Sequence, residues 1–430
     1  MPTLVSARRV LLACFLSLTA AGLAGADNWP QWRGPTNDGI CKEAGLPTEW
    51  SESKNVAWTL KMPGKGGSTP AVWGDHIFLT SADGEGIVLL CVNTQGKELW
   101  RRELGRGDRA FMRGEGNNAS PSPATDGKHV YAFAGTGDLA CFDFDGKEVW
   151  KFNMQERYGK YSAMHGLHNT PLLDGDRLYL EYFSAGPQKM AYVIALNKAD
   201  GKEIWKVERK SDGSGENLDS YTSPLIWRKG KDAYLITHGN DYAIAHRLED
   251  GSEVWRVGGL NPKEGYRRDL RFVASPAASA DLIVIPSAKD HGVVGLKPDA
   301  QGMVMPGSSS ELWRMKNHTP DVPSPLIHDG LVYLCRENGN LICLDAKTGQ
   351  EKYTQPLHRA IYRASPVEAG GLIYLTARDG VVTVVKAGPK FEKVAENSLP
   401  DDIAASPAIS GGRIYLRGWK TLYAIGAPAK

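Results

Sequence analysis

Leu196-Asn197-Lys198-Ala199-Asp200-Gly201-Lys202-Glu203-Ile204-Trp205 is one copy of a signal that recurs along the chain and sets its architecture. Related Gly-Lys-Glu-x-Trp-like endings fall at Trp100, Trp150, Trp205, Trp255, Trp313 and Tyr353, with a degenerate copy near Val394. A Ser/Thr-Pro step precedes each ending, and these steps place proline at Pro70, Pro123, Pro171, Pro224, Pro276, Pro325, Pro366 and Pro407. A period of roughly 40 to 50 residues, filled with short strands and turns, is typical of a β-propeller.

Residues 69–104 show the repeating unit. Four short apolar or alternating runs are separated by Gly-Asp, Asp-Gly and Gln-Gly steps, which predicts four antiparallel strands joined by tight turns. Proline suits the head of the first strand, because the innermost strand of a propeller has one edge that makes no ladder bonds. The tryptophan of the outer strand is expected to pack between neighbouring blades rather than to bind a ligand.

The two ends of the chain supply one blade between them. The last repeat stops after residues 421–425, one strand short, whereas residues 55–60 around Trp58 look like an outer strand that lacks the first three. Pairing these segments would close the ring and remove an exposed sheet edge. The sequence therefore predicts an all-β, eight-bladed β-propeller of four-stranded antiparallel blades, closed by an N-terminal strand.

Residues 1–26 have the pattern of a signal peptide: Arg8 and Arg9, an apolar run over residues 10–23 and a small-residue cleavage site at residues 24–26. A lipid anchor at Cys14 is disfavoured because almost no apolar segment would precede it. We expect an N-terminal arm at 27–54, a single propeller domain at 55–426 and a tail at 427–430. The arm is expected to lie along the surface, and its two tryptophans indicate that it is docked there. The signal peptide predicts an exported protein that is periplasmic or extracellular. Association with the cell envelope is one form of this hypothesis.

Charge and cysteine content exclude some classes of function. Loss of Arg8 and Arg9 with the leader lowers the formal charge from +2 to 0, which argues against a nucleic-acid binder. No later segment is long enough to be a transmembrane helix. The remaining cysteines are Cys41, Cys91, Cys141, Cys335 and Cys343. Three of them occupy a slot that other repeats fill with small apolar residues, so buried thiols are favoured, although a Cys335–Cys343 disulfide across one hairpin is conceivable.

The repeats carry a family resemblance. Residues 196–205 and 344–351 resemble the tryptophan-docking repeat of the pyrroloquinoline-quinone-type propellers. That superfamily includes quinoprotein alcohol dehydrogenases and the non-catalytic propeller subunit of the outer-membrane barrel-assembly machinery. Residues 29–35, Trp-Pro-Gln-Trp-Arg-Gly-Pro, are similar to the arm of exported propellers from planctomycete-like bacteria. The enzyme branch implies adjacent cysteines, calcium ligands and a catalytic Asp, whereas this chain has no Cys-Cys or Cys-x-x-Cys-His step.

Unusual residues gather in the loops that precede the Ser/Thr-Pro steps. Such loops join the outer strand of one blade to the inner strand of the next, and all of them open at one mouth of the channel. Mixed charge and aromatic residues in a concave mouth indicate a ligand site. The candidate ligand-binding residues are Arg109, Arg113, His165, His168, Tyr221, Arg267, Arg268, Arg271, His318, Arg359, Tyr362 and Arg363.

The step from His165 to His168 also suggests a metal site, but its glycine-containing loop lacks the helix and the following Glu of a zinc protease. We therefore expect no metal site, no catalytic residue and no firmly implied cofactor. The favoured function is a non-enzymatic binding or scaffold module for a protein, peptide or glycan partner. The alternative is a dehydrogenase that uses pyrroloquinoline quinone with calcium and has a diverged pocket, and a hydrolase or lyase is a third hypothesis.

Overall fold

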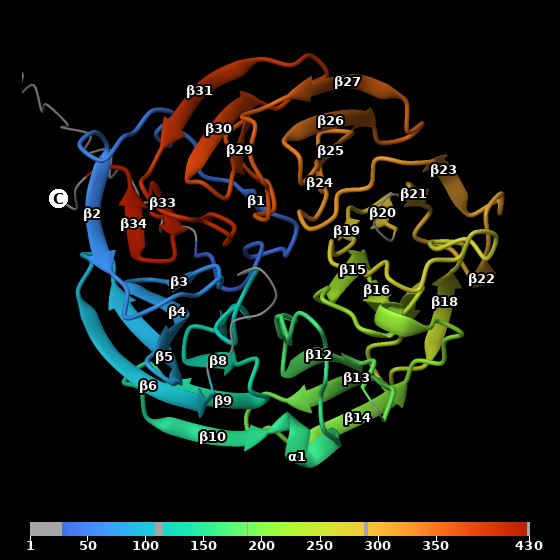
Figure 1. Ribbon diagram of the computed structural model, residues 1–430, viewed down its shortest axis with the longest axis horizontal. Coiled ribbons are helices and arrows are strands. Elements are labelled where there is room, and N and C mark those ends of the chain that lie inside the picture. The colour runs from blue at the N-terminus through green and yellow to red at the C-terminus, as the bar shows by residue number, and fades with distance from the viewer. Residues whose placement is uncertain (1–27, 108–114, 187, 288–290, 428–430) are drawn as a thin grey trace, which may run out of the picture.

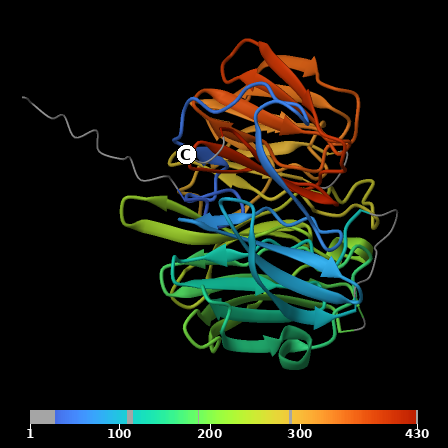
Figure 2. The ribbon, with the colours of Figure 1, turned by 90° about the vertical axis from the view of Figure 1, so that its left-hand side faces the viewer.

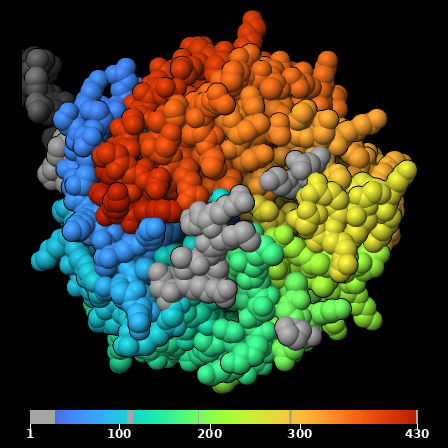
Figure 3. All heavy atoms as spheres, in the orientation of Figure 1, coloured from blue at the N-terminus to red at the C-terminus, as the bar shows by residue number. Residues whose placement is uncertain are grey.

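The computed structural model describes residues 28–107, 115–186, 188–287 and 291–427. Within these residues, eight sheets surround a central axis, each with four antiparallel strands and two with an added parallel strand, which confirms the all-β, eight-bladed propeller (Figure 1). The chain passes around the disc in sequence order, so that the first and last blades are neighbours (Figure 3). No helix among the described residues is long and apolar enough to cross a bilayer.

Each blade is named by its order in the chain. Blade 1 contains β3 (Ala71–Trp73), β4 (His76–Asp83), β5 (Gly86–Asn93) and β6 (Glu98–Arg106), and blade 2 contains β7 (Ala124–Thr125), β8 (His129–Phe133), β9 (Asp138–Asp143) and β10 (Glu148–Asn153). Blade 3 contains β11 (Leu172–Asp174), β12 (Arg177–Ser184), β13 (Met190–Asn197) and β14 (Glu203–Glu208). Blade 4 contains β15 (Leu225–Lys229), β16 (Asp232–Gly239), β17 (Tyr242–His246), β18 (Glu253–Val257) and the added β22 (Gly302–Val304). Blade 5 contains β19 (Ala277–Ala278), β20 (Ile283–Pro286), β21 (Val293–Leu296) and β23 (Glu311–Met315), and blade 6 contains β24 (Leu326–His328), β25 (Leu331–Cys335), β26 (Asn340–Asp345) and β27 (Glu351–Pro356). Blade 7 contains β28 (Val367–Ala369), β29 (Leu372–Thr376), β30 (Val381–Lys386), β31 (Lys393–Ser398) and the added β1 (Ile40–Cys41). Blade 8 contains β32 (Ala408–Ser410), β33 (Arg413–Arg417), β34 (Thr421–Ile425) and β2 (Val56–Lys61). The helical elements are α1 (Met154–Tyr158) and the 3₁₀ turn η2 (Gly215–Leu218).

Blade 8 closes the ring as the sequence predicts. Strand β2 pairs antiparallel with β34, with Trp58 opposite Ala424 and Thr59 opposite Tyr423. The closing strand comes from before blade 1, and the other three come from the end of the chain. Because β2 completes blade 8 and then leads into blade 1, the first and last blades are joined and the ring is closed.

The outer-strand tryptophans join neighbouring blades. The indole N–H of Trp150 donates to the carbonyl of Lys198 at 2.9 Å, in the β13–β14 turn of the next blade. Gly201 in that turn has a φ of 67°, and a Cβ there would approach the Trp150 ring to 2.9 Å. Only glycine accepts both conditions, which explains why the repeat requires a Gly before its Lys-Glu step. Equivalent indole bonds are made by Trp58, Trp100, Trp205 and Trp313. The expected packing between blades is confirmed.

The Ser/Thr-Pro steps form a second connection, which encircles the channel. At seven of the eight junctions, the backbone N–H of one step donates to the side-chain oxygen of the next, for example from Ser275 to Ser324 at 3.0 Å. We call these eight residues the hydroxyl belt: Thr69, Ser122, Thr170, Ser223, Ser275, Ser324, Ser365 and Ser406. In seven of the eight steps, the hydroxyl residue before the proline therefore has a structural role, because it accepts the N–H of the preceding blade.

The N-terminal arm, expected along the surface, instead enters the channel. We call the face at the start of the inner strands the mouth face and the opposite face the base face. On the base face, the Asn28 side chain accepts the N–H of Gly74 in the β3–β4 turn at 2.8 Å. From there the arm bonds to the inner strands of blades 1, 2, 3, 4 and 6 and continues along blades 7 and 8 (Figure 2).

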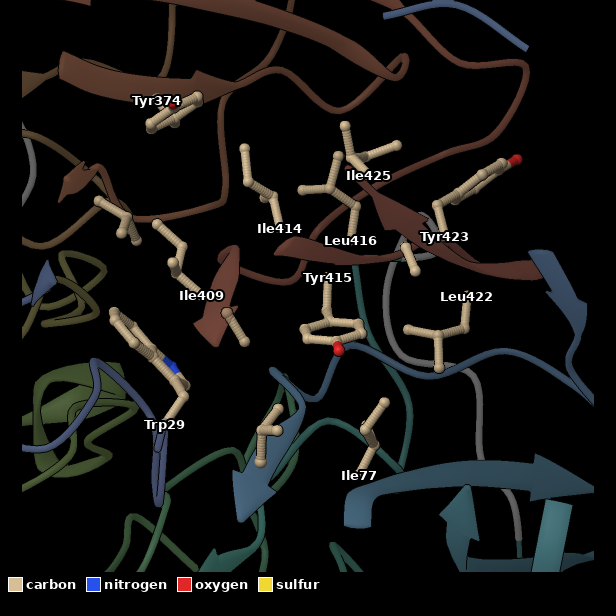
Figure 4. Close-up of a cluster of buried hydrophobic side chains, with 14 of the residues drawn as sticks. Trp29, Ile77, Tyr374, Ile409, Ile414, Tyr415, Leu416, Leu422, Tyr423 and Ile425 are labelled. Carbon is tan, nitrogen blue, oxygen red and sulfur yellow. The ribbon is translucent and has the colours of Figure 1, made fainter. Parts of the chain in front are cut away.

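Buried side chains of the arm fix it in place. Trp29 is fully buried beside Ile409 and near Tyr415 in the last blade (Figure 4). Arg33 donates to the carbonyls of Asp38 and Pro325 at 2.7 and 2.8 Å, and burial lowers its pKa to about 10. The arm therefore acts as a plug that occupies the base end of the channel.

The cysteines are thiols in packed positions. Cys335 and Cys343 lie in adjacent strands of blade 6 and form no disulfide with each other. Both are fully buried, and burial raises the pKa of the Cys343 thiol to about 11. The slot interpretation of the sequence, with a small apolar side chain between strands, accounts for the environment of Cys343.

Candidate functional site

A cavity of about 230 Å³ lies in the channel and is lined by residues from all eight blades. The side chain of Trp32, which belongs to the plug, lines it together with the whole hydroxyl belt. Charged and aromatic residues of the mouth face complete the lining. The plug fills the base end of the channel. From the base face to the mouth face, the cavity is therefore lined first by the aromatic side chain of Trp32, then by the hydroxyl belt and last by a charged rim.

The rim carboxylates are paired with arginines. Glu115 accepts two hydrogen bonds from the Arg363 guanidinium, at 2.8 and 2.9 Å, and a third from Arg378 at 3.3 Å. The bonds from Arg363 hold the pKa of Glu115 below its usual range, so the group is a carboxylate at neutral pH. Arg271 lies 3.3 Å from a carboxylate oxygen of Asp321, whose side chain is 3% exposed. Neither carboxylate is therefore arranged as a general base.

The two rim histidines are neutral at pH 7. Burial lowers the pKa of His168 to about 4, and its ring contacts the backbone carbonyl of His165. Burial and the nearby Arg271 lower the pKa of His165, whose Nε2 lies 3.5 Å from Glu216. Neutral imidazoles add hydrogen-bonding groups to the rim without adding charge.

A basic cluster stands on the side of the rim formed by blades 1, 7 and 8. Trp419, in the turn between β33 and β34, carries the Lys65 ammonium 4.4 Å from its ring centroid and the Arg378 guanidinium at 4.7 Å. Within the described residues, no carboxylate lies within ion-pair distance of Lys65. Cations at such distances from an indole face are attracted by its negative potential. The arrangement holds Lys65 at the cavity without neutralising it.

The belt gives the cavity an unusual wall. In seven of its residues the side-chain oxygen accepts a backbone N–H, as described above, which leaves the O–H proton to be donated elsewhere. Among the described residues, no protein acceptor takes any of these eight protons. The wall is therefore a ring of hydroxyl donors that also keep a lone pair for accepting.

Five of the twelve candidate residues line this cavity: His165, His168, Tyr221, Arg271 and Arg363. Five others lie outside it. Arg267, Arg268 and Arg359 are exposed, and His318 is exposed beside Arg336 at 3.2 Å. Tyr362 is fully buried in the core, where its hydroxyl donates to the carbonyl of His358 at 3.3 Å. Arg109 and Arg113 lie outside the described residues.

Several lining residues are absent from the candidates predicted from the sequence. Lys65 precedes the first Ser/Thr-Pro step, as the loop rule requires, but it stands alone in a glycine-rich stretch without the mixed charge and aromatic residues of the other loops. Trp419 comes from a turn between the second and third strands of a blade, a class of loop that the rule leaves out. Trp32 belongs to the plug, where no repeat offers an alignment. The Ser/Thr of each step was visible as a pattern, but only its proline was interpreted.

The residues present do not fit a quinone held by calcium. Within the described residues, no group of three or more His, Cys, Asp or Glu side chains could hold a metal ion. The rim carboxylates Glu115 and Asp321 are engaged by arginines, and the sequence has no adjacent cysteines to cover a cofactor. His165 and His168 do not converge on a third ligand of these types. We therefore derive no chemistry through such a group.

Comparison with known proteins agrees with this fold. The chain is 27% identical over 239 residues to the outer membrane protein assembly factor BamB of Yersinia pestis, an alignment that covers 53% of this chain and 54% of that protein. It is 25% identical over 152 residues to the quinoprotein ethanol dehydrogenase of Pseudomonas aeruginosa, which covers 31% of this chain and 23% of that enzyme. The chain thus matches only about half, or less, of the length of these curated relatives.

Solved structures share the fold at low identity. BamB from Moraxella catarrhalis superposes with a TM-score of 0.60 at 13% identity, over 86% of this chain and 96% of that one. Quinohemoprotein alcohol dehydrogenase from Comamonas testosteroni gives 0.69 at 13% identity, over 94% and 81%. A profile described as outer membrane protein assembly factor BamB matches residues 84–281 and 302–388. Because this profile spans more than half of the chain, the protein belongs to the pyrroloquinoline-quinone-type repeat family that bears that description.

Proposed function

We propose that this protein is an exported, non-enzymatic binding module that holds a protein, peptide or glycan through the mouth face and the exposed blade edges. The observation that carries the proposal is the cavity walled by all eight blades. A concave site with convergent polar groups on a rigid scaffold is the arrangement that ligand binding requires. The plug supports it further, because a channel filled at its base end receives ligands from the mouth.

The state of the rim groups favours binding over catalysis. Glu115 is held by Arg363, Asp321 faces Arg271, and the histidines have lowered pKa values that leave them weak bases. A general base needs a pKa near the working pH and access to a proton. The alternative, a quinone-dependent dehydrogenase, lacks a matching donor set for calcium among the described residues.

Export and a place in the cell envelope rest on the leader pattern of residues 1–26 and on the relative named as an outer membrane protein assembly factor. A protein of this family that acts outside the cytoplasm would meet peptides, unfolded chains and glycans. We infer that the partner belongs to one of these classes.

Two experiments test the proposed function. In the first, pyrroloquinoline quinone and calcium are added to the purified protein, and the melting temperature and dye-linked alcohol oxidation are followed. We expect neither stabilisation nor turnover, and saturable stabilisation with turnover would replace the binding module by the enzyme.

The second experiment asks whether the mouth binds. The wild-type protein and the variant Arg271→Gln/Arg363→Gln are compared on peptide and glycan arrays. The matched control is Arg267→Gln/Arg268→Gln, which changes two exposed arginines outside the cavity. Loss of binding only in the cavity variant supports the proposal, and equal binding by all three proteins refutes it.

A further inference from the structure

The cavity has the size of a single small ligand. Its volume is about 230 Å³. One sugar ring with its substituents occupies such a space, whereas a longer oligomer would have to extend out of the mouth. Among the described residues that line the cavity, the apolar ones beyond the aromatic residues are Val273, Val322 and Ala404.

The wall matches a ligand that carries hydroxyl groups on all sides. Each belt residue offers an O–H donor, and each retains acceptor capacity on the same oxygen. The belt surrounds the cavity through all eight blades, from Thr69 in blade 1 to Ser406 in blade 8. Sugar hydroxyls both donate and accept, so they complement such a ring around their whole perimeter.

The charge at the rim selects a negative group. Three cations line the cavity, Lys65, Arg271 and Arg363, whereas Glu115 is the one carboxylate in its described lining. Two of the cations already hold carboxylates, whereas the Lys65 ammonium lies over the Trp419 ring and pairs with no carboxylate among the described residues. Its ammonium retains donors for a further anion. A ligand carboxylate at this point would neutralise the remaining charge.

An aromatic side chain lies on the plug side. Trp32 is half-buried, lines the cavity, and makes no indole hydrogen bond to the described residues. An indole offers an apolar face and one N–H donor. Both properties suit the mixed C–H and O–H surface of a pyranose.

We propose that this cavity binds one acidic sugar residue, a pyranose bearing a carboxylate, with the carboxylate at Lys65 and the hydroxyls against the belt. This inference rests on the proposed function and specifies its ligand. The free monosaccharide and the terminal residue of an anionic glycan share the same chemistry. A peptide carboxylate is the competing ligand, and the test separates it from the sugar.

The experiment is isothermal titration of the purified protein with galacturonate and glucuronate. Galactose and glucose serve as neutral counterparts, acetate as a carboxylate without hydroxyls, and a short acidic peptide as the competing class. We expect saturable binding of a hexuronate, and binding of the other ligands at least tenfold weaker. Equal or tighter binding of acetate or the peptide would overturn the sugar assignment.

Matched variants place the carboxylate. Lys65→Met keeps the aliphatic stem and should weaken hexuronate binding by about ten- to hundredfold, the effect of one lost charge-assisted hydrogen bond. Lys65→Arg should restore it. The control Lys97→Met makes the same change at an exposed lysine in the β5–β6 turn of the same blade, on the base face. An affinity unchanged by Lys65→Met would refute the assigned position.

The failure of this inference differs from the failure of the proposed function. If the arrays detect ligands that depend on Arg271 and Arg363 while both hexuronates fail in titration, the ligand class is wrong and the binding module stands. If hexuronates bind and Lys65→Met weakens them, both are supported. If nothing binds at the mouth, both are refuted.

Discussion

Replacing Ser324 by alanine should weaken the junction between blades 5 and 6. The Ser324 hydroxyl accepts the Ser275 N–H at 3.0 Å, and the two residues are 1% and 3% exposed. The alanine variant removes the acceptor and leaves a buried donor without a protein partner. Such a loss costs about 1–3 kcal/mol of unfolding free energy, the lower end applying if water in the cavity reaches the amide.

The change in melting temperature follows from the size of the domain. For a propeller of residues 55–426, about 2.1 cal/mol/K per residue gives an unfolding entropy of about 0.8 kcal/mol/K. A loss of 1–3 kcal/mol then lowers Tm by about 1–4 °C. Calorimetry resolves a shift of this size, provided that the wild type and the variant unfold in one cooperative transition.

Two further variants make the test specific. Ser324→Thr keeps the oxygen acceptor, as Thr170 does in the natural belt, and should recover most of the lost stability. Ser309→Ala removes an exposed hydroxyl and should leave Tm unchanged. If Ser324→Ala is as stable as the wild type, or if the threonine variant is no better than alanine, the belt does not join the blades energetically.

Two other predictions concern ring closure and pH. Trp58→Ala removes the packing against Tyr415, 6.1 Å between ring centroids, and the indole bond to the carbonyl of Thr94. It should lower the unfolding free energy by up to about 3 kcal/mol, measured by guanidinium unfolding. The control Thr59→Ala changes an exposed residue of the same strand and should cost little, and an equal loss in both variants would contradict the role of Trp58 in closing the ring. Burial raises the pKa of Glu181 from its ordinary value of 4.5 to about 7, so the folded protein keeps a proton that the unfolded chain releases. The contribution of this residue to stability therefore falls as the pH rises from about 4.5 to about 7. Glu181→Gln should remove that decline, seen as a stability difference between the two proteins that changes across this window by an amount on the order of 3 kcal/mol; parallel pH profiles would show that Glu181 is ionised in the folded state.

The fold was predictable because its two sequence signals are both contacts between blades. Trp150 reaches the turn of the next blade and Ser275 reaches the next Ser/Thr-Pro step, and contacts of these two kinds recur at most of the junctions between blades. Repetition made the number of blades countable from the sequence. The closing strand was predictable for the same reason, since Trp58 carries the outer-strand signal without the strands that normally precede it.

The site was less predictable, because a position in a loop does not determine which way a side chain faces. Arg271 lines the cavity, but Arg267, four residues earlier in the same loop, pairs with Asp269 in solvent. The preceding part of this loop is held away from the cavity, where the Asn217 side chain donates to the Arg267 carbonyl at 2.7 Å. Only the long-range contacts of the folded loop separate these arginines.

The contribution of the arm was hidden for a different reason. Residues 29–35 have no counterpart in the repeats, so alignment of repeats says nothing about where they lie. Arg33 reaches the carbonyl of Pro325, a partner 292 residues away in the chain. Two tryptophans in so short a segment indicated docking, but not insertion into the channel.

The plug has a practical consequence for handling the molecule. Asn28, the first described residue, is bonded to the β3–β4 turn, and the carbonyl of Ala427, the last described residue, accepts a bond from Arg413 beside the β32–β33 turn at 3.2 Å, so both ends of the described chain lie on the base face. A tag, a surface linker or a fused domain joined directly at either of these residues would leave from that side. The molecule can therefore be immobilised through its tails on a sensor chip with the cavity presented to the flowing solution.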